Sequence, residues 1–315
     1  MTTTTASPVK SSPLRFAAIV VIGGLLVFLV YQLASSGERA SAAPARTTKG
    51  GGNPVVFLAA ASNTDLEGMS RQLGAGVDVN TVQLDVGAER GMSALMYAAR
   101  SGNTQAIKAL LDAKARANQA AEDQQTALMF AARAEDPDAV KLLLEAGANY
   151  DARSSQGMTA LMFAVARGKA ETVRLLLATG ARVDDRNKWG QTALMLAARQ
   201  SDLEKLQLLL NAGAAINNQD NDGATPLAIA ASSADPMVVK LLIDRSAKVD
   251  LADLEGVTPL MKAAERGDPV IVKLLVEAGA SKTLTDQRKW TASKWAANRG
   301  DDFGNAIVKQ LGEGN

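Results

Sequence analysis

The chain has 315 residues, of which 47% are hydrophobic, so it is long enough to bury a core. Its 34 lysines and arginines nearly balance its 33 aspartates and glutamates, and the net charge of +1 gives no reason to expect nucleic-acid binding. The chain contains no cysteine and no histidine. This excludes zinc sites built from those residues, a cysteine nucleophile and a Ser-His-Asp triad.

The N-terminal end begins with a polar tail, which is followed by an apolar run. Residues 1–15 are rich in Thr and Ser, and residues 16–34 carry no charge and are dominated by Ile, Val, Leu and Phe. A helix of this length, at about 1.5 Å per residue, spans roughly the 30 Å hydrocarbon core, so the run predicts a transmembrane signal anchor. A signal peptide cleaved near Ala40–Ala42 is the alternative. The length of the run, and Glu38 and Arg39 beside that site, favour an uncleaved anchor.

The charges that flank the apolar run bear on its orientation. Lys10 and Arg15 precede it, and three basic residues follow it, so the tally is nearly balanced. A short tail before a single early span is the common layout of a bacterial signal anchor. This layout predicts a single-pass inner-membrane protein with the rest of the chain in the periplasm. Residues 35–53, rich in Ser, Ala and Gly, are predicted to form a flexible linker.

The remainder of the chain repeats itself with a fixed period. Six leucines recur at intervals of 33 residues, and a serine or threonine stands two places before each. The leucines are Leu95, Leu128, Leu161, Leu194, Leu227 and Leu260, and the hydroxyl residues are Ser93, Thr126, Thr159, Thr192, Thr225 and Thr258. A period of this length predicts a solenoid, in which each unit buries its apolar face against its neighbours.

The first half of one repeat, taken from residues 157–190, predicts a short helix. Thr159 is suited to cap its N-terminus, because the hydroxyl can accept a bond from an early backbone N–H. Leu161 and Ala164 share the face that is expected to be buried. Gly168 is expected to end the helix in the left-handed conformation.

The second half of the repeat predicts another helix and a hairpin. Gly180 is expected to end this helix, and Asp184 is expected to turn the chain by bonding its own backbone. Each unit is therefore predicted to be a helix, a turn, a second helix and a hairpin.

The motif G-x-T-[AP]-L, followed by A-A, V-x-L-L and G-A, resembles the ankyrin repeat. The resemblance covers residues 54–315, with a divergent first repeat at 54–90, six regular repeats at 91–285 and a C-terminal cap at 286–315. It implies a mainly α fold, an ankyrin-repeat α-solenoid with short β-hairpin or loop fingers, preceded here by one N-terminal transmembrane helix. The chain thus resembles a bacterial, membrane-anchored ankyrin-repeat protein.

The chain departs from the ankyrin pattern at several positions. The residue after the leucine, usually histidine in the family, is methionine in five repeats, namely Met96, Met129, Met162, Met195 and Met261. Packed helices lie about 8–10 Å apart, which favours core packing over copper ligation by these thioethers. Gln124 stands at the hairpin glycine and Ser201 at the glycine between the helices. Both are expected to weaken their repeats locally.

An arginine recurs five or six positions after most of the leucines. The arginines are Arg100, Arg133, Arg167, Arg199 and Arg266, with Arg299 in the cap. A five-residue step turns a helix by about 140°, so we expect them to form one row on the inner, concave surface. They are either solvated helix-end residues that suit the dipole or a ladder that binds an acidic segment of another protein.

The hairpin tips beside this row carry residues suited to binding. Lys188, Trp189, Met158 and Met92 lie where ankyrin proteins similar to this one present contacts, and Trp and Arg are common hot-spot residues. The resemblance therefore implies a membrane-tethered, non-catalytic scaffold that binds a protein partner. The second reading of the arginine row gives this partner an acidic segment.

Two other classes of function remain as alternatives. One is an inhibitor or immunity protein for an envelope enzyme. An enzyme is the least favoured, because paired carboxylates such as Asp220 and Asp222 belong to the hairpin register. No catalytic residue, cofactor, metal ion or nucleic acid is expected.

Overall fold

The computed structural model describes residues 51–84, 89–134, 136–233 and 235–312, which all belong to one compact unit of the chain. The predicted tail, the predicted membrane span and most of the predicted linker lie outside the described residues. Across the described ranges, no helix combines the length and the apolar character needed to cross a membrane.

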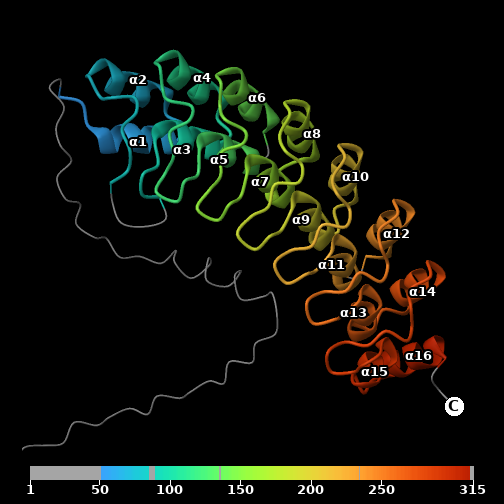
Figure 1. Cartoon of the computed structure of the whole chain (residues 1–315). Helices are drawn as coiled ribbons and strands as arrows, with labels where there is room; N and C mark the ends of the chain where they lie inside the picture. The colour runs from blue at the N-terminus through green and yellow to red at the C-terminus, as the bar shows by residue number, and fades with distance from the viewer. Residues whose placement is uncertain (1–50, 85–88, 135, 234, 313–315) are drawn as a thin grey trace, which may run out of the picture. The chain divides into compact units, whose positions relative to one another are not determined.

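The described residues form sixteen helices in eight consecutive pairs (Figure 1). The pairs are α1 (Pro54–Ser62) and α2 (Leu66–Gly74), α3 (Ala94–Ser101) and α4 (Thr104–Asp112), α5 (Ala127–Arg133) and α6 (Pro137–Glu145), α7 (Ala160–Arg167) and α8 (Ala170–Ala178), α9 (Ala193–Gln200) and α10 (Leu203–Asn211), α11 (Pro226–Ser233) and α12 (Pro236–Asp244), α13 (Pro259–Arg266) and α14 (Pro269–Glu277), and α15 (Ala292–Ala297) and α16 (Asp302–Leu311).

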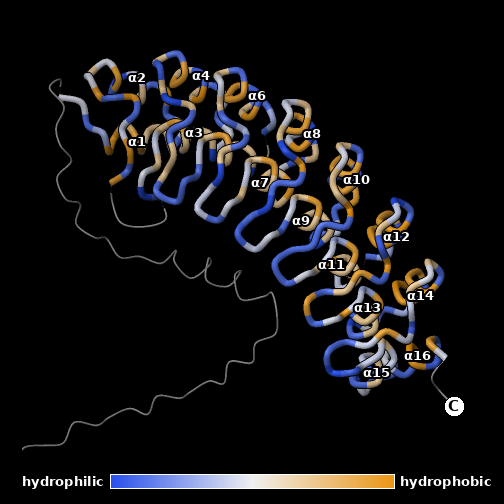
Figure 2. The backbone as a smooth tube through the Cα atoms, viewed as in Figure 1, coloured by the Kyte–Doolittle hydropathy of each residue, from blue (hydrophilic) through white to orange (hydrophobic). Residues whose placement is uncertain are grey.

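The helices lie in two rows. The odd-numbered helices pack against one another in succession from α1 to α15, and the even-numbered helices do the same from α4 to α16. The loops that join one pair to the next extend from the side of the odd-numbered row (Figure 1). These loops are largely hydrophilic, whereas the helices carry most of the hydrophobic residues (Figure 2). The stack therefore has one side formed by loops and odd-numbered helices and another formed by even-numbered helices.

Most odd-numbered helices begin with the predicted hydroxyl cap. Thr192 Oγ1 accepts a hydrogen bond from the N–H of Met195 at 3.4 Å, and Met195 Sδ accepts one from the N–H of Thr192 at 3.5 Å. The thioether thus takes the part that a glutamate plays in a capping box. The same reciprocal pair forms in α3 and α13.

The recurring leucines and methionines form the core. The six leucines and the five methionines are each at most 1% exposed. Their burial confirms that the methionine series belongs to the core, where a flexible unbranched side chain fills space between helices.

The predicted β-hairpins are absent from the described residues, where pairing is limited to two isolated bridges, Val82 with Ser93 and Ala120 with Thr126. Every finger after the first is closed in part by a side-chain oxygen that accepts from its own backbone. Asn187 Oδ1, for example, accepts from the N–H groups of Trp189 at 3.0 Å and Gln191 at 2.9 Å. These bonds form a local turn in place of an extended ladder.

The predicted left-handed conformation of Gly168 is wrong. Gly168 has φ −85° and ψ −178°, which is extended backbone. A Cβ atom at this position would clash with the carbonyl oxygen of Ala132 in the preceding repeat. The glycine is therefore required for close approach between repeats. Gly180, at φ +93°, does adopt the predicted left-handed conformation.

The predicted role of Asp184 is also wrong. Its Oδ1 accepts from the backbone N–H of Ala215 at 3.0 Å and from Asn218 Nδ2 at 3.2 Å, both in the next repeat. This carboxylate therefore joins two repeats and does not turn its own backbone.

Candidate protein-binding face

The fingers, which we define as the turns directly before the odd-numbered helices α3 to α15, are tied to one another through their backbones. In every finger after the first, a backbone N–H of the tip donates to a carbonyl of the preceding tip at 2.7–3.1 Å. The donor and acceptor residues are Glu122 and Arg90, Ser155 and Asp123, Lys188 and Gln156, Asn221 and Trp189, Leu254 and Asp222, and Gln287 and Glu255. This ladder fixes the spacing of the tips along the stack, so their side chains form one continuous edge.

The fourth finger presents the aromatic residue singled out in the sequence. Trp189 is 51% exposed, and Lys188 beside it is also exposed. Met158 is half-buried against the core, and its Sδ accepts from Asn187 Nδ2 at 3.6 Å. Met92, which the sequence predicts to lie at a finger tip and contact a partner, is 1% exposed and belongs to the core. Of these four side chains, Trp189 and Lys188 are therefore the ones open to a partner.

Three of the predicted arginines share one register, five residues after the leucine, and lie against the base of a finger. Arg100 Nη1 donates to Glu89 Oε1 at 2.6 Å, and its guanidinium lies over the ring of Tyr97, 5.1 Å from the centroid. Arg133 Nη1 donates to Gln125 Oε1 at 3.4 Å.

The third arginine of this register makes the equivalent contact. With the Gln191 amide oriented so that its oxygen faces the guanidinium, Gln191 Oε1 accepts from Arg199 Nη2 at 2.7 Å. Arg100 and Arg199 are exposed and Arg133 is half-buried. The three guanidinium groups therefore lie in the angle between fingers and odd-numbered helices.

The other two predicted arginines do not continue this row. Arg167 and Arg266 are exposed but stand six residues after their leucines, which rotates them by about 100° from the first register. In that second register, Gln200 Nε2 donates to the carbonyl of Ala166 at 3.0 Å, and Arg299 Nη1 donates to the carbonyl of Glu265 at 2.6 Å. This second register lies at the boundary between successive odd-numbered helices. The single expected row is thus two rows.

A set of aromatic and aliphatic residues that the sequence analysis missed lies beneath the first arginine register. These residues stand two places after the first five of the six recurring leucines and are Tyr97, Phe130, Phe163, Leu196 and Ile229. They lie three residues before the arginine position, on the same helix face. The guanidinium of Arg133 lies 5.7 Å from the centroid of the Phe163 ring in the following repeat. Their fixed distance from the leucines is a signal that sequence analysis could have used.

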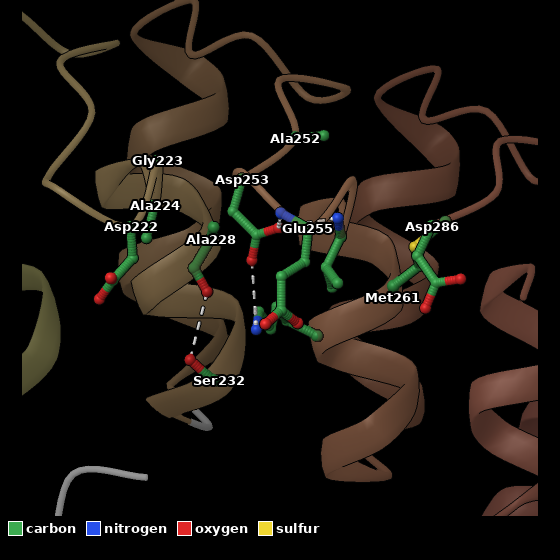
Figure 3. A network of polar contacts seen from close by, with 12 residues as sticks. Asp222, Gly223, Ala224, Ala228, Ser232, Ala252, Asp253, Glu255, Met261 and Asp286 are labelled. Atoms are coloured by element: carbon green, nitrogen blue, oxygen red, sulfur yellow. Dashed lines mark hydrogen bonds and ion pairs between the residues drawn. The ribbon is translucent and has the colours of Figure 1, made fainter. Parts of the chain in front are cut away.

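The charge of this face changes along the stack. Beyond α9 the arginine register holds Ser232, whose hydroxyl donates to Ile229 O at 2.9 Å within its own helix, and then Glu265, which is exposed. The carboxylates of Asp222, Asp253 and Glu255 follow one another along the fingers here (Figure 3). The basic part of the face therefore spans α3 to α9.

Glu89, which pairs with Arg100, is a carboxylate of this face whose pKa is shifted by its surroundings. Partial burial acts to raise its pKa, but hydrogen bonds from Arg100 and Tyr97 and the charge of Arg100 together outweigh burial. The pKa of Glu89 therefore lies below its ordinary value. Glu89 remains ionised near neutral pH and holds the Arg100 guanidinium at the finger.

Two tryptophans pack against each other at the C-terminal end of the face. The rings of Trp290 and Trp295 meet edge to face at 5.6 Å, and Arg288 lies over both rings. Asp286, whose side chain is 1% exposed, accepts from Trp295 Nε1 at 3.1 Å. The aromatic surface in this finger is thus covered by a side chain of the same finger.

Paired helices stacked in two rows, with fingers on one side, define an α-solenoid. The family model for ankyrin repeats matches residues 56–154, 150–220, 195–286 and 227–313, and the chain belongs to the ankyrin-repeat family. The family generally mediates protein–protein interactions and is typically not catalytic. A search of curated proteins gives no match to the chain.

Proposed function

We propose that this protein is a non-catalytic scaffold that binds an acidic segment of a protein partner through the basic part of the finger face. The observation that carries the proposal is the register shared by Arg100, Arg133 and Arg199, which brings three guanidinium groups to the bases of successive or near-successive fingers. Trp189 and Lys188 lie at the exposed tips beside them.

The energetics favour a ligand that runs along several repeats. An exposed charged pair contributes about 0.2–1 kcal/mol, so one arginine is too weak to hold a partner. Several such pairs along the stack, together with an exposed tryptophan as an apolar anchor, add their contributions to one extended contact. Gln125 and Gln191 are neutral acceptors, so a carboxylate that replaces them gains a charge-assisted bond to the same guanidinium.

The experiment that tests this function uses the full chain with a photoactivatable cross-linker at position 188, in place of Lys188. The matched control carries it at position 108, in place of Lys108, which is exposed on α4 in the even-numbered row. We expect a defined cross-linked protein from the first variant and none from the second. Equal cross-linking from both positions would contradict binding at the fingers.

We also propose that the chain is anchored in the inner membrane of a bacterium, with the repeats in the periplasm. The uncharged, apolar sequence of residues 16–34 and the Ser/Ala/Gly-rich sequence of residues 35–53 support this proposal. A C-terminal reporter that is active only after export is expected to be active. If instead a C-terminal reporter that works only in the cytoplasm is active, the proposed orientation is wrong.

A further inference from the structure

The even-numbered helices α12, α14 and α16 present three large apolar side chains to solvent. Met237 is 59% exposed, Val270 is 53% exposed and Phe303 is 61% exposed. Each is the second residue of its helix, and each stands 33 residues from the next. Because α12 packs against α14 and α14 against α16, the three side chains form one stripe across adjacent helices. We call it the outer stripe.

The same position is polar in every earlier repeat, which shows that the fold does not require an apolar side chain there. The five residues in this register are all exposed, and they are Glu67, Gln105, Asp138, Glu171 and Glu204. Acidic side chains suit this position because they interact favourably with the N-terminal end of the helix dipole. The last three repeats give up that interaction and expose apolar surface instead.

The outer stripe lies beside a shallow depression and between two sets of charged side chains. A shallow depression of about 670 Å³ adjoins Val270 and is lined by Pro269, Val270, Lys273, Val276, Glu277 and Gln310. On one flank lie Lys240 and Lys273, each held only by an exposed ion pair within its own helix. On the other flank lie the capping carboxylates Asp235, Asp268 and Asp301, the last of which also pairs with Arg299 at 2.6 Å. An apolar stripe is therefore bordered by positive charge on one side and negative charge on the other.

The size of the stripe argues against a second copy of this chain as its occupant. Three side chains that each expose somewhat more than half of themselves offer on the order of 300 Å², whereas a standard interface buries about 800 Å² on each partner. The spacing matches one helix. Packed helices lie about 8–10 Å apart, and a heptad of an α-helix rises about 10.5 Å, so apolar residues at i, i+7 and i+14 meet successive side chains of the stripe.

We infer that the outer stripe binds an amphipathic helix of another protein, which lies across α12, α14 and α16. Its apolar residues are heptad-spaced and contact Met237, Val270 and Phe303. Its acidic residues lie toward Lys240 and Lys273, and its basic residues lie toward the capping aspartates. This surface is on the even-numbered row and is independent of the finger face.

The test uses the purified full chain and a fluorescent peptide of roughly six helical turns with heptad-spaced leucines, lysines on one shoulder and glutamates on the other. The control peptide has the same composition, with its leucines moved to five-residue spacing. We expect saturable binding of the first peptide, and affinity for the control peptide at least tenfold lower. Absence of saturable binding, or equal affinity for the two peptides, would overturn the inference.

Variants locate the site and separate it from a second copy. The triple change Met237→Glu, Val270→Glu and Phe303→Glu installs a residue type that the same register already carries in α8 and α10, so the fold is expected to survive. It should weaken binding at least tenfold. Adding Asp138→Leu, Glu171→Leu and Glu204→Leu to this variant should restore binding at the new position. Unchanged binding by the triple variant would overturn the inference, and so would wild-type dimers that the triple change abolishes.

Discussion

Asp184 Oδ1 accepts a hydrogen bond from the backbone N–H of Ala215, 31 residues further along the chain, at 3.0 Å. The same link recurs between Asn118 and Asn149, Asn217 and Lys248, and Asp250 and Ser281, at 2.6–2.9 Å. At these four junctions, neighbouring repeats are therefore joined through a polar side chain in the loop as well as through the core, and these bonds hold the loops in register.

The first prediction concerns this link. Asp184→Ala removes the acceptor for two donors, so it should lower the free energy of unfolding by about 1–2 kcal/mol, as measured by urea denaturation. Asp184→Asn keeps one acceptor oxygen, and asparagine already serves at positions 118 and 217, so it should cost less than half as much. Equal losses for the two variants would contradict the role of the hydrogen bond.

The second prediction concerns backbone strain in the second finger. Gln124 has φ +62°, where glycine is favoured, so Gln124→Gly should raise the free energy of unfolding by about 1 kcal/mol. The opposite change, Gly157→Ala at φ +73°, should lower it by at least as much, because the new Cβ would lie 3.0 Å from the backbone nitrogen of Lys188. If the urea denaturation midpoints of Gln124→Gly and Gly157→Ala shift in the same direction, backbone strain at Gln124 is refuted.

The third prediction concerns the methionine caps. Met195→Leu loses the acceptor for the Thr192 N–H but conserves the side-chain volume. Because the volume is conserved, it should lower the free energy of unfolding by under about 1.5 kcal/mol. Met195→Ala leaves a cavity in a fully buried site and should cost about 2–5 kcal/mol. Similar losses for leucine and alanine would show that the sulfur bond, and not packing, dominates.

The helices and the core follow from the sequence because they depend on local chemistry. A hydroxyl residue and a buried leucine recur in every regular repeat, and the hydroxyl caps its helix in all of them except at Thr126. Because the period is 33 residues throughout, the same pattern is seen several times in one sequence. The roles of Asp184 and Gly168 could not be obtained in this way. Both depend on atoms of a neighbouring repeat, and a single repeat gives no information about them.

The candidate site was predicted in part. The arginines were found from their recurrence, but five-residue and six-residue offsets were treated as one row, although Arg133 and Arg167 point about 100° apart. Phe163 was not recognised, because an apolar residue in a repeat is expected in the core. The end of the basic face at Ser232 was visible in the sequence, but the hydroxyl's bond to its own helix was not.

The fourth prediction concerns pH. The folded-state pKa of Glu89 is lowered, so its contribution to stability is present above the unfolded value of about 4.5 and is lost as pH falls through the folded value. Because the side chain is half-exposed, screening limits this contribution to under about 1 kcal/mol. Glu89→Gln should therefore be less stable than the wild type at pH 7, and the difference in stability should shrink as the pH falls below about 4.5. A stability difference that does not change with pH would contradict the Arg100–Glu89 pairing.

The fifth prediction concerns the finger face, which is the centre of the proposed function. Arg100→Glu, Arg133→Glu and Arg199→Glu together reverse the charge of the three arginines that share the first register. Lys108→Glu, Lys141→Glu and Arg174→Glu make the same change in net charge on the even-numbered helices of adjoining repeats, where all three side chains are exposed. A single Arg199→Ala should cost only about 0.2–1 kcal/mol of binding energy.

The measurement that tests the proposed function is the affinity of the full chain for a fluorescent glutamate-rich peptide, determined at low and at physiological salt. We predict that the finger-face reversal weakens binding at least tenfold while circular dichroism remains unchanged. The control reversal should weaken it far less, and salt should weaken wild-type binding by screening. Equal loss in the two triple variants, or undiminished binding by the finger-face variant, would contradict the account.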